Sequence, residues 1–422
     1  MLTVLRNRNF LLLWSGGLVS LMGTWMLLAA LPFYLYQITG SALASGGLFM
    51  AYVAPGALFG TVAGVFVDRW DRRRVLLVGN LLAAVLIPWL LFTDAVGASA
   101  VWVVYLVIFL ESCVTQFLMP AENALLPTLV DEAHLVSANS LNALNDNLAR
   151  VVGAALGAVL LGTAGFRNVV IIDAASYAVA AVTIALMSLA PSVAQAARAA
   201  GARWRQVRQE WVDGLRLVTR SPLFRNLFIV VGVGLLGDAI LSALLAPFAQ
   251  EVAGFSATDY GWVLAARGVG GLAGGLLLAQ IGSKLSPNLM LSGGLLGTGL
   301  MLLAMILAPK LPVILSLMMV AGPLYMAWLI CMQTVLQKGA EDRFRGRVFG
   351  AYSTVGTILM FVGSGLGGSL ADTLGIRNLM IAAAGIYMLA GLLGWLLLRR
   401  PLRTVDLGGV ARPEPQPEAE AG

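Results

Sequence analysis

The sequence predicts an all-α membrane protein whose twelve transmembrane helices form two six-helix bundles. Hydrophobic residues make up 59% of the 422 residues and charged residues only 11%, which is far more apolar than an average soluble domain. Apolar segments of about 20 residues, long enough to cross a hydrocarbon core, recur along the chain. An internal repeat also relates the second half of the chain to the first.

Twelve apolar segments define the predicted helices. The first follows Arg6 and Arg8, but it is too long for the apolar region of a signal peptide, so we assign it as a helix of the protein. The predicted spans are residues 10–38, 43–67, 75–93, 99–123, 138–164, 168–190, 223–250, 257–281, 289–308, 311–338, 347–373 and 377–398.

Positive charge is distributed unequally between the two ends of these helices. One side holds the arginines near the N-terminus, those at 69–74, those of the segment between the halves, and the basic residues at 338–347 and 399–403. The opposite loops hold only Arg167, Lys310 and Arg377. Because Lys and Arg in short loops stay in the cytoplasm, both termini are predicted to be cytoplasmic.

The internal repeat has an offset of 210 residues, at which residues 151–177 align with residues 361–387 without a gap. Three glycines, an Arg-Asn pair and a tyrosine match: Gly153, Gly157, Gly165, Arg167, Asn168 and Tyr177 with Gly363, Gly367, Gly375, Arg377, Asn378 and Tyr387. Nearer the N-terminus the offset becomes 215, where Pro32 and Phe33 align with Pro247 and Phe248. A repeat in the same orientation relates the halves by an axis along the membrane normal.

The repeat and the composition divide the chain into four parts. These are an N-terminal six-helix bundle at 1–190, a cytoplasmic linker at 191–221, a C-terminal six-helix bundle at 222–400 and a cytoplasmic tail at 401–422. The tail is rich in Pro and Glu, which predicts disorder. The linker places aromatic and aliphatic residues near helical spacing among arginines, so an interfacial amphipathic helix and a solvated linker both remain open.

A specific spacing of glycine, acid and arginines follows the second span. Residues 64–74 read GVFVDRWDRRR and resemble the loop signature of the major facilitator superfamily through Gly64, Asp68, Arg69, Arg72 and Arg73. The resemblance covers essentially the whole chain. It implies that Asp68 faces the positive N-terminal end of the eleventh predicted helix, residues 347–373, and holds a cytoplasmic gate shut in one state. The alternative is a generic positive-inside loop.

A second stretch resembles one branch of that superfamily. Residues 120–130 read PAENALLPTLV and are followed by LVSANSL at 135–141 and LARVVG at 148–153, as in macrolide-efflux and enterobactin exporters. This resemblance implies an exporter of drugs, siderophores or related amphiphiles that is driven by proton antiport. The chain departs from the antiporter pattern at residues 153–157, which lack the usual Gly-Pro.

Four ionisable residues fall deep inside predicted spans, where charges are costly and mark functional sites. Glu111 and Arg150 both lie about 18 Å from a membrane face by residue count, so they are able to pair. Asp238 and Arg267 reach similar depths in the second half. The hypothesis is that Glu111 or Asp238 binds a proton in alternation with the binding of cargo. The two arginines would then tune the pKa of the carboxyls or contact anionic cargo. The alternative is a static ion pair, in which Asp146, four residues before Arg150, neutralises that arginine.

Polar and aromatic residues on the helices that line the central cavity in this superfamily are the candidate cargo contacts. They are Trp25, Tyr34, Gln37, Gln116, Asn123, Tyr325, Trp328 and Gln333. Asn123 and Gln333 align at the 210 offset. The alternative is an interfacial aromatic belt, above all for Tyr34 and Gln37. We also interpret Asp173 as interfacial and His134 as a surface residue.

The function predicted is secondary active export of small amphiphilic molecules by alternating access, in a bacterial plasma membrane. Within transport, a nutrient or metabolite importer and a lipid-translocating protein remain alternatives. A membrane scaffold or receptor is the alternative outside transport. We expect no enzyme, because neither a clustered catalytic set nor a glycine-lysine phosphate loop is present. We further expect a monomer without cofactor, metal or nucleic acid, which uses a proton gradient.

Overall fold

The fold is known from a computed structural model that describes residues 2–67, 69–188, 219–340, 342–399 and 401–404. This part of the chain contains twelve helices long and apolar enough to cross a membrane, and it contains no strand. The predicted all-α fold with twelve spans is therefore confirmed. Most of the predicted linker, residues 191–218, and the tail after residue 404 lie outside the described residues.

The first six spans are built from helices α2 to α9. A short helix α1 (Leu2–Leu5) precedes them, and 3-10 or π-helical turns extend or join several of the helices. The first three spans are α2 (Arg8–Thr39); α3 (Ala42–Val67); and α4 (Arg72–Leu86) continued by η1 (Ile87–Leu90) and α5 (Leu91–Val96). The fourth span consists of η2 (Gly97–Ala100), α6 (Val101–Leu125) and η3 (Leu126–Thr128). The fifth consists of η4 (Glu132–His134), α7 (Leu135–Leu148), η5 (Ala149–Gly153) and α8 (Ala154–Ala164), and the sixth is α9 (Phe166–Ala185).

The last six spans are built from helices α11 to α16. They are α11 (Pro222–Pro247) with η6 (Phe248–Val252), α12 (Ala257–Ile281) with η7 (Gly282–Lys284), η8 (Leu289–Gly293) with α13 (Gly294–Leu307), α14 (Leu311–Gly339), α15 (Asp342–Leu374) and α16 (Ile376–Leu397). Within the predicted disordered tail, Pro401–Thr404 form the 3-10 turn η9, where Leu402 is buried and its N–H bonds the carbonyl of Leu398.

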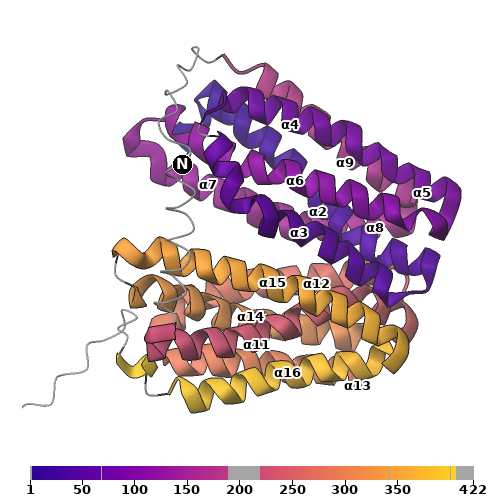
Figure 1. Ribbon diagram of the computed structural model, residues 1–422, viewed down its shortest axis with the longest axis vertical. Coiled ribbons are helices and arrows are strands. Elements are labelled where there is room, and N and C mark those ends of the chain that lie inside the picture. The colour runs from indigo at the N-terminus through magenta and orange to yellow at the C-terminus, as the bar shows by residue number, and fades with distance from the viewer. Residues whose placement is uncertain (1, 68, 189–218, 341, 400, 405–422) are drawn as a thin grey trace, which may run out of the picture.

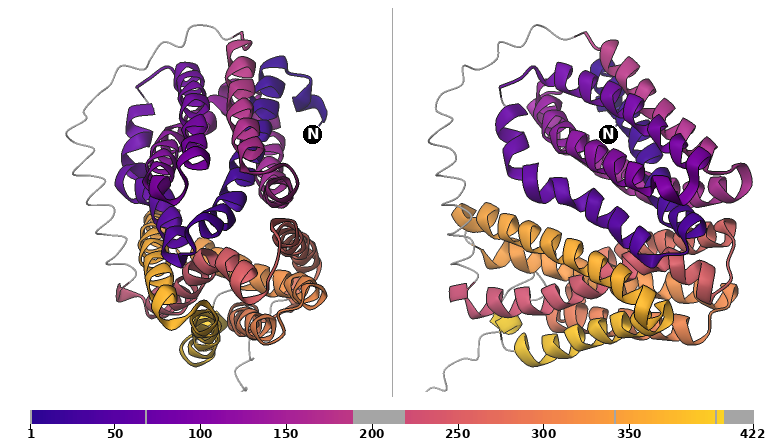
Figure 2. Two further views of the ribbon diagram at one scale, coloured as in Figure 1. Left: turned by 90° about the vertical axis from the view of Figure 1, so that its right-hand side faces the viewer. Right: turned by 45° about the vertical axis from the view of Figure 1, so that its right-hand side comes forward.

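The helices form two groups that meet at one end and diverge at the other. Figures 1 and 2 show α2–α9, the first group, on one side and α11–α16, the second group, on the other. The two groups are in contact near the right-hand edge of Figure 1. We call that end the distal side; it carries the turns at Gly40, Gly165, Gly254 and Gly375. The other end, where α2 and α11 begin, is the terminal side. The main contacts between the groups pair α3 with α15 and α8 with α12.

Repeat-matched glycines explain how helices of each group approach one another. Gly157 of α8 packs on the backbone of Met26 in α2, and its repeat partner Gly367 of α15 lies against the Cα of Ile240 in α11. A side chain at Gly157 would push the helices apart, and one at Gly367 would require Ile240 to give way slightly. Gly165 and Gly375 have φ angles of 81° and 86°, which glycine adopts without strain, and each lets the next helix start directly.

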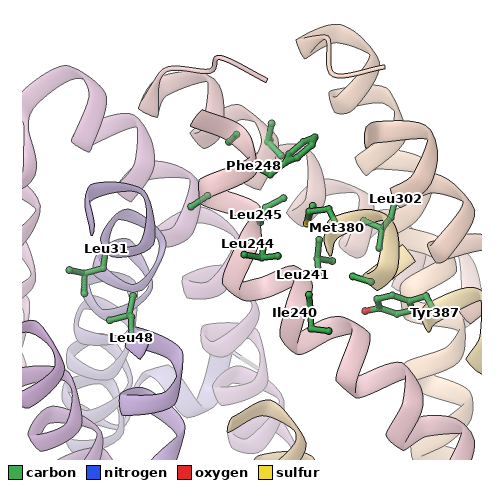
Figure 3. Packing of buried hydrophobic residues seen from close by; sticks show 14 of the residues in the cluster. Leu31, Leu48, Ile240, Leu241, Leu244, Leu245, Phe248, Leu302, Met380 and Tyr387 are labelled. Carbon is green, nitrogen blue, oxygen red and sulfur yellow. The ribbon is translucent and has the colours of Figure 1, made fainter. Parts of the chain in front are cut away.

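The apolar core of the second group is formed around α11. Figure 3 shows Leu241 and Leu245 of α11 beside Met380 of α16, with Leu302 of α13 and Phe248 of η6 nearby. Leu302 and Phe248 are buried as fully as residues of a soluble core. The core fixes the position of α11, which carries Asp238.

Candidate functional site

A buried carboxyl joins three helices of the first group. Glu111 of α6 has a relative exposure of only 3%. The Tyr177 hydroxyl of α9 donates to Glu111 Oε1 over 2.6 Å, and Thr24 Oγ1 of α2 lies 2.9 Å from the same hydroxyl. Hydrogen bonds to a charged acceptor are stronger than neutral ones, so a change of charge on Glu111 is felt at α6, α9 and α2 together.

The second group has a related arrangement around Asp238 of α11. The Tyr387 hydroxyl of α16 donates to Asp238 Oδ1 over 2.7 Å. Arg267 of α12 places Nη2 at 4.0 Å from the same oxygen, and its guanidinium lies 5.8 Å from the ring centre of Tyr325. This half-buried carboxyl therefore has a cation beside it, whereas the described residues place none in an ion pair with Glu111.

The two tyrosines are equivalent in the repeat, whereas the two acids are not. Tyr177 and Tyr387 match at the 210 offset, so each group presents a hydroxyl at the same place. Glu111 reaches this hydroxyl from the fourth span and Asp238 from the seventh. The position that aligns with Asp238 at the 215 offset is Gly23. The repeat thus preserves the donor while the acceptor approaches from different helices.

Asp173 lies inside the first group, which corrects the prediction that it is interfacial. Its relative exposure is 1%, one helical turn before Tyr177. The Ser176 hydroxyl donates to the Asp173 carbonyl over 2.7 Å and lies 3.5 Å from Oδ1, while Oδ2 has no hydrogen-bond partner among the described residues. Gly23 brings α2 close to this side chain. Depth along a helix did not reveal which way the side chain faces, so sequence reasoning missed this second acid.

The predicted pairing of Glu111 with Arg150 does not form in the described residues. Arg150 lies in the π-helical turn η5, and its guanidinium is 5.2 Å from the ring centre of Trp25 on α2. Arg150 and Asp146 are both exposed. A π turn adds one residue and rotates the rest of the helix, which the count along an ideal helix does not anticipate.

The other candidate cargo contacts are dispersed. Tyr34 is buried and stacks on Phe166 with ring centres 3.7 Å apart, while Gln37 is exposed near the distal end of α2. Trp328 is enclosed at 1% exposure and packs edge-to-face with Tyr325 at 5.3 Å. Trp328 therefore serves the core of the second group in this conformation.

Three polar candidates lie nearer the terminal side. Gln116 is half-buried on α6 and faces Gly56 and Gly60 of α3. Asn123 and Gln333, which align in the repeat, are both exposed. Their exposure in both groups places them at accessible surface in this conformation.

A further acid, Glu122 on α6, was not singled out from the sequence. It is half-buried, accepts a hydrogen bond from Asn142 over 3.2 Å and lies close to Gly17 of α2. The available signal was its place inside the stretch PAENALLPTLV.

The residues of the predicted gating motif have separate places. Gly64 belongs to α3, and Asp68 lies outside the described residues. Arg69 is half-buried. Arg72 donates to the carbonyl of Ala124, and Arg73 to those of Ile184 and Ala185, over 2.7 to 3.1 Å. These arginines satisfy carbonyls at the ends of α6 and α9, where cations are favoured.

An apolar pocket opens between α11, α14 and α15. Its walls include Leu227, Phe228 and Leu235 of α11, Met332 of α14 and Tyr352 of α15. Tyr352 supplies the only hydroxyl among its lining residues. Such a lining suits an apolar or aromatic ligand group better than a charged one.

Comparison with known proteins agrees with this architecture. The chain is 28% identical to the multidrug efflux pump Tap of Mycolicibacterium fortuitum over 96% of this chain and 99% of the relative. It is 26% identical to macrolide efflux protein A of Streptococcus pyogenes, over 88% and 91%.

Solved structures share the fold. The nucleoside transporter NupG matches with a TM-score of 0.74 at 12% identity, over 93% of this chain and 99% of that one. A bacterial homologue of the iron transporter ferroportin, in an inward-facing state, matches with a TM-score of 0.73 at 18% identity over the same shares. The family model described as Major Facilitator Superfamily matches residues 13–364 and 227–420. The chain therefore belongs to the Major Facilitator Superfamily, as a multi-pass bacterial membrane transporter and not an enzyme.

Proposed function

We propose that this transporter exports small amphiphilic molecules by proton antiport. The observation that carries the proposal is the pair of intramembrane carboxyls, Glu111 and Asp238, each bonded to a repeat-matched tyrosine. Ionisable residues at such depth mark proton relays and ion pathways. Relatives named as a multidrug efflux pump and a macrolide efflux protein support export of amphiphiles.

The positive-inside rule supports a cytoplasmic terminal side and an external distal side. Contacts between the two groups on the distal side then correspond to an external gate that is closed. Tyr36 donates to Glu251, and Gln250 donates to the carbonyl of Phe33 over 2.7 Å, both across the two groups. In this state cargo enters from the cytoplasm, and rocking of the groups exposes it outside.

Proton exchange at the two carboxyls supplies the coupling. An ionised carboxyl only accepts hydrogen bonds, whereas a protonated one also donates. At Glu111 the change alters the bond with Tyr177, which links α9 to α6. At Asp238 protonation removes the charge that faces Arg267, so the guanidinium is released toward anionic cargo groups or the Tyr325 ring.

The test is transport by purified protein in proteoliposomes, with erythromycin and ethidium as first probes. An imposed pH gradient should drive probe movement in the wild type. Glu111→Gln and Asp238→Asn should each weaken this response, and the double variant should reduce it to the level of protein-free vesicles. Glu132→Gln is the matched control, because Glu132 is an exposed acid near the start of α7.

Two results would contradict the proposal. If transport by the double variant stays fully dependent on the pH gradient, proton coupling does not run through these two acids. If intact cells accumulate the probes and lose this accumulation when the protein is deleted, the direction of transport is import and not export.

A further inference from the structure

A single carboxylate of the second group binds the start of a helix in the first group. Asp372 lies two residues before the distal end of α15. Its Oδ2 accepts from the Ser41 hydroxyl over 2.6 Å and from the Leu43 N–H over 3.4 Å, and its Oδ1 accepts from the Ala42 N–H over 2.7 Å. Three donors at the N-terminus of α3 thus converge on one side chain from the other group.

The chemistry of this contact favours an anion. The first N–H groups of a helix have no partner within the helix, and the helix dipole adds partial positive charge there. Side chains that cap helices usually precede the helix in sequence. Asp372 instead lies 330 residues from Ala42, so this cap exists only while the two groups touch on the distal side.

The backbones below the cap fit closely. A Cβ on Gly368 of α15 would lie 2.8 Å from the Cα of Leu43, and one on Gly46 of α3 would lie 2.5 Å from the carbonyl of Ser364. Small residues therefore let the distal ends of α3 and α15 cross in backbone contact. Separation of these ends removes the packing and all three hydrogen bonds together.

We propose that Asp372 is a latch for the transport cycle: it holds the distal side closed in the conformation described, and its release is required for distal opening. The inference rests on the alternating-access part of the proposed function, and it is independent of export and of proton coupling. If the contact adds no net stability, replacing Asp372 leaves the ratio of distal-open to distal-closed protein unchanged, whereas loss of a latch raises that ratio.

The antiparallel arrangement of α3 and α15 gives the latch a counterpart in sequence. α3 ends at Val67, directly before Asp68, on the terminal side where α15 begins. Each of the two helices is thus associated with an aspartate at its C-terminal end. Asp68 itself lies outside the described residues.

The experiment measures the distal distance between the two groups with spin labels. Ser99→Cys and Lys310→Cys place one label on each group, at exposed distal positions, after Cys113 and Cys331 are replaced by serine. The protein is held in lipid nanodiscs without cargo, and distance distributions are recorded for Asp372→Asn, Asp372→Ala and Ser41→Ala. Asp259→Asn is the matched control, because Asp259 caps α12 on the same side through Ser256 of its own group.

Loss of the latch should increase the ratio of distal-open to distal-closed protein. We expect a rise of about 5- to 30-fold for Asp372→Ala, the range for loss of one or two such interactions. Asp372→Asn and Ser41→Ala should shift the ratio in the same direction by less, and Asp259→Asn should leave it unchanged.

Unchanged distance distributions in folded Asp372→Ala protein would overturn the proposal, because the contact would then add nothing to the distal-closed state. An equal shift in Asp259→Asn would also overturn it, since any weakened helix start would then suffice. If Asp372→Ala does not fold, the Ser41→Ala distribution decides in the same way. Because the readout needs neither cargo nor a pH gradient, these results do not depend on the test of export.

Discussion

Each helix group uses a tyrosine hydroxyl to hold a membrane-embedded carboxyl. Glu111 accepts from Tyr177, and Asp238 accepts from Tyr387 while also facing Arg267. The two carboxyls therefore differ in how much they depend on their tyrosine. Among the described residues, Tyr177 is the hydrogen-bond donor to Glu111, whereas Asp238 keeps a cation at 4.0 Å if its tyrosine is lost.

Removal of each hydroxyl tests this difference. Tyr177→Phe keeps the buried ring but leaves the Glu111 carboxyl without that donor, and we expect a loss of about 1–3 kcal/mol in stability. Tyr387→Phe should cost less, because Arg267 remains near Asp238. Thermal unfolding in detergent and transport driven by a pH gradient measure both effects. Equal behaviour of the two variants would contradict the assignment of Arg267 as a second partner.

Asp173 provides a separate prediction at this scale. Its Oδ2 is buried without a hydrogen-bond partner in the part of the chain that the structure describes, and its helix also carries Tyr177. Asp173→Asn keeps the shape while removing any charge, so it should be neutral or stabilising if Asp173 is merely tolerated in the core. We expect instead a loss of coupled transport with retained folding, measured as pH-gradient dependence beside the unfolding temperature. Wild-type transport in Asp173→Asn would exclude Asp173 from coupling.

Depth along the chain placed Glu111, Asp238 and Arg267 inside the spans, but it missed Glu122 and gave no information about partners. Glu111 was identified correctly as an embedded acid, and its partner is Tyr177 instead of Arg150. A residue count gives the height of a side chain on an ideal helix but not its direction, and Arg150 lies in the π-helical turn η5, where its guanidinium contacts the ring of Trp25. Tyr177 and Tyr387 were visible as a repeat match, yet sequence alone gave no reason to place an acid beside either.

At the scale of elements, glycine determines how closely the helices approach. The repeat identified Gly157 and Gly367 as matched positions, but only the structure shows that they face Met26 and Ile240. Glycine in a helix interior costs about 1 kcal/mol relative to alanine when nothing packs on it. At position 157 glycine is required because the backbone of α2 lies where a side chain would be.

Two alanine substitutions separate these cases. Gly157→Ala places a methyl group against backbone atoms of Met26. Backbone atoms cannot swing aside as a flexible side chain does, so we expect destabilisation of about 1–3 kcal/mol. Gly385→Ala on α16 is the matched control, because no atom of the described residues lies within 4 Å of its added Cβ. That variant should be neutral or more stable. Thermal unfolding decides, and equal effects would show that α8 and α2 adjust without cost.

At the scale of the molecule, the sequence predicted twelve spans and their pairing into two repeats, but not the conformation. Both open states of an alternating-access protein contain the same helices, and they differ by a few contacts between groups. Those contacts, such as Gln250 with Phe33 and Asp372 with Ala42, join residues more than 200 positions apart. No local pattern in a single sequence identifies such pairs.

The orientation of the whole molecule follows from charge and has a direct test. Basic residues gather on the terminal side, so the distal loops should face the outside of the cell. In protein without Cys113 and Cys331, a cysteine at Ser99 on the distal side should react with a membrane-impermeant maleimide in intact cells. A cysteine at Val136, which is 79% exposed on the terminal side, should react only after the cells are permeabilised. Because both positions are accessible to water-borne reagents on their own side, the reverse labelling pattern would invert the topology, and with it the direction of every gate proposed above.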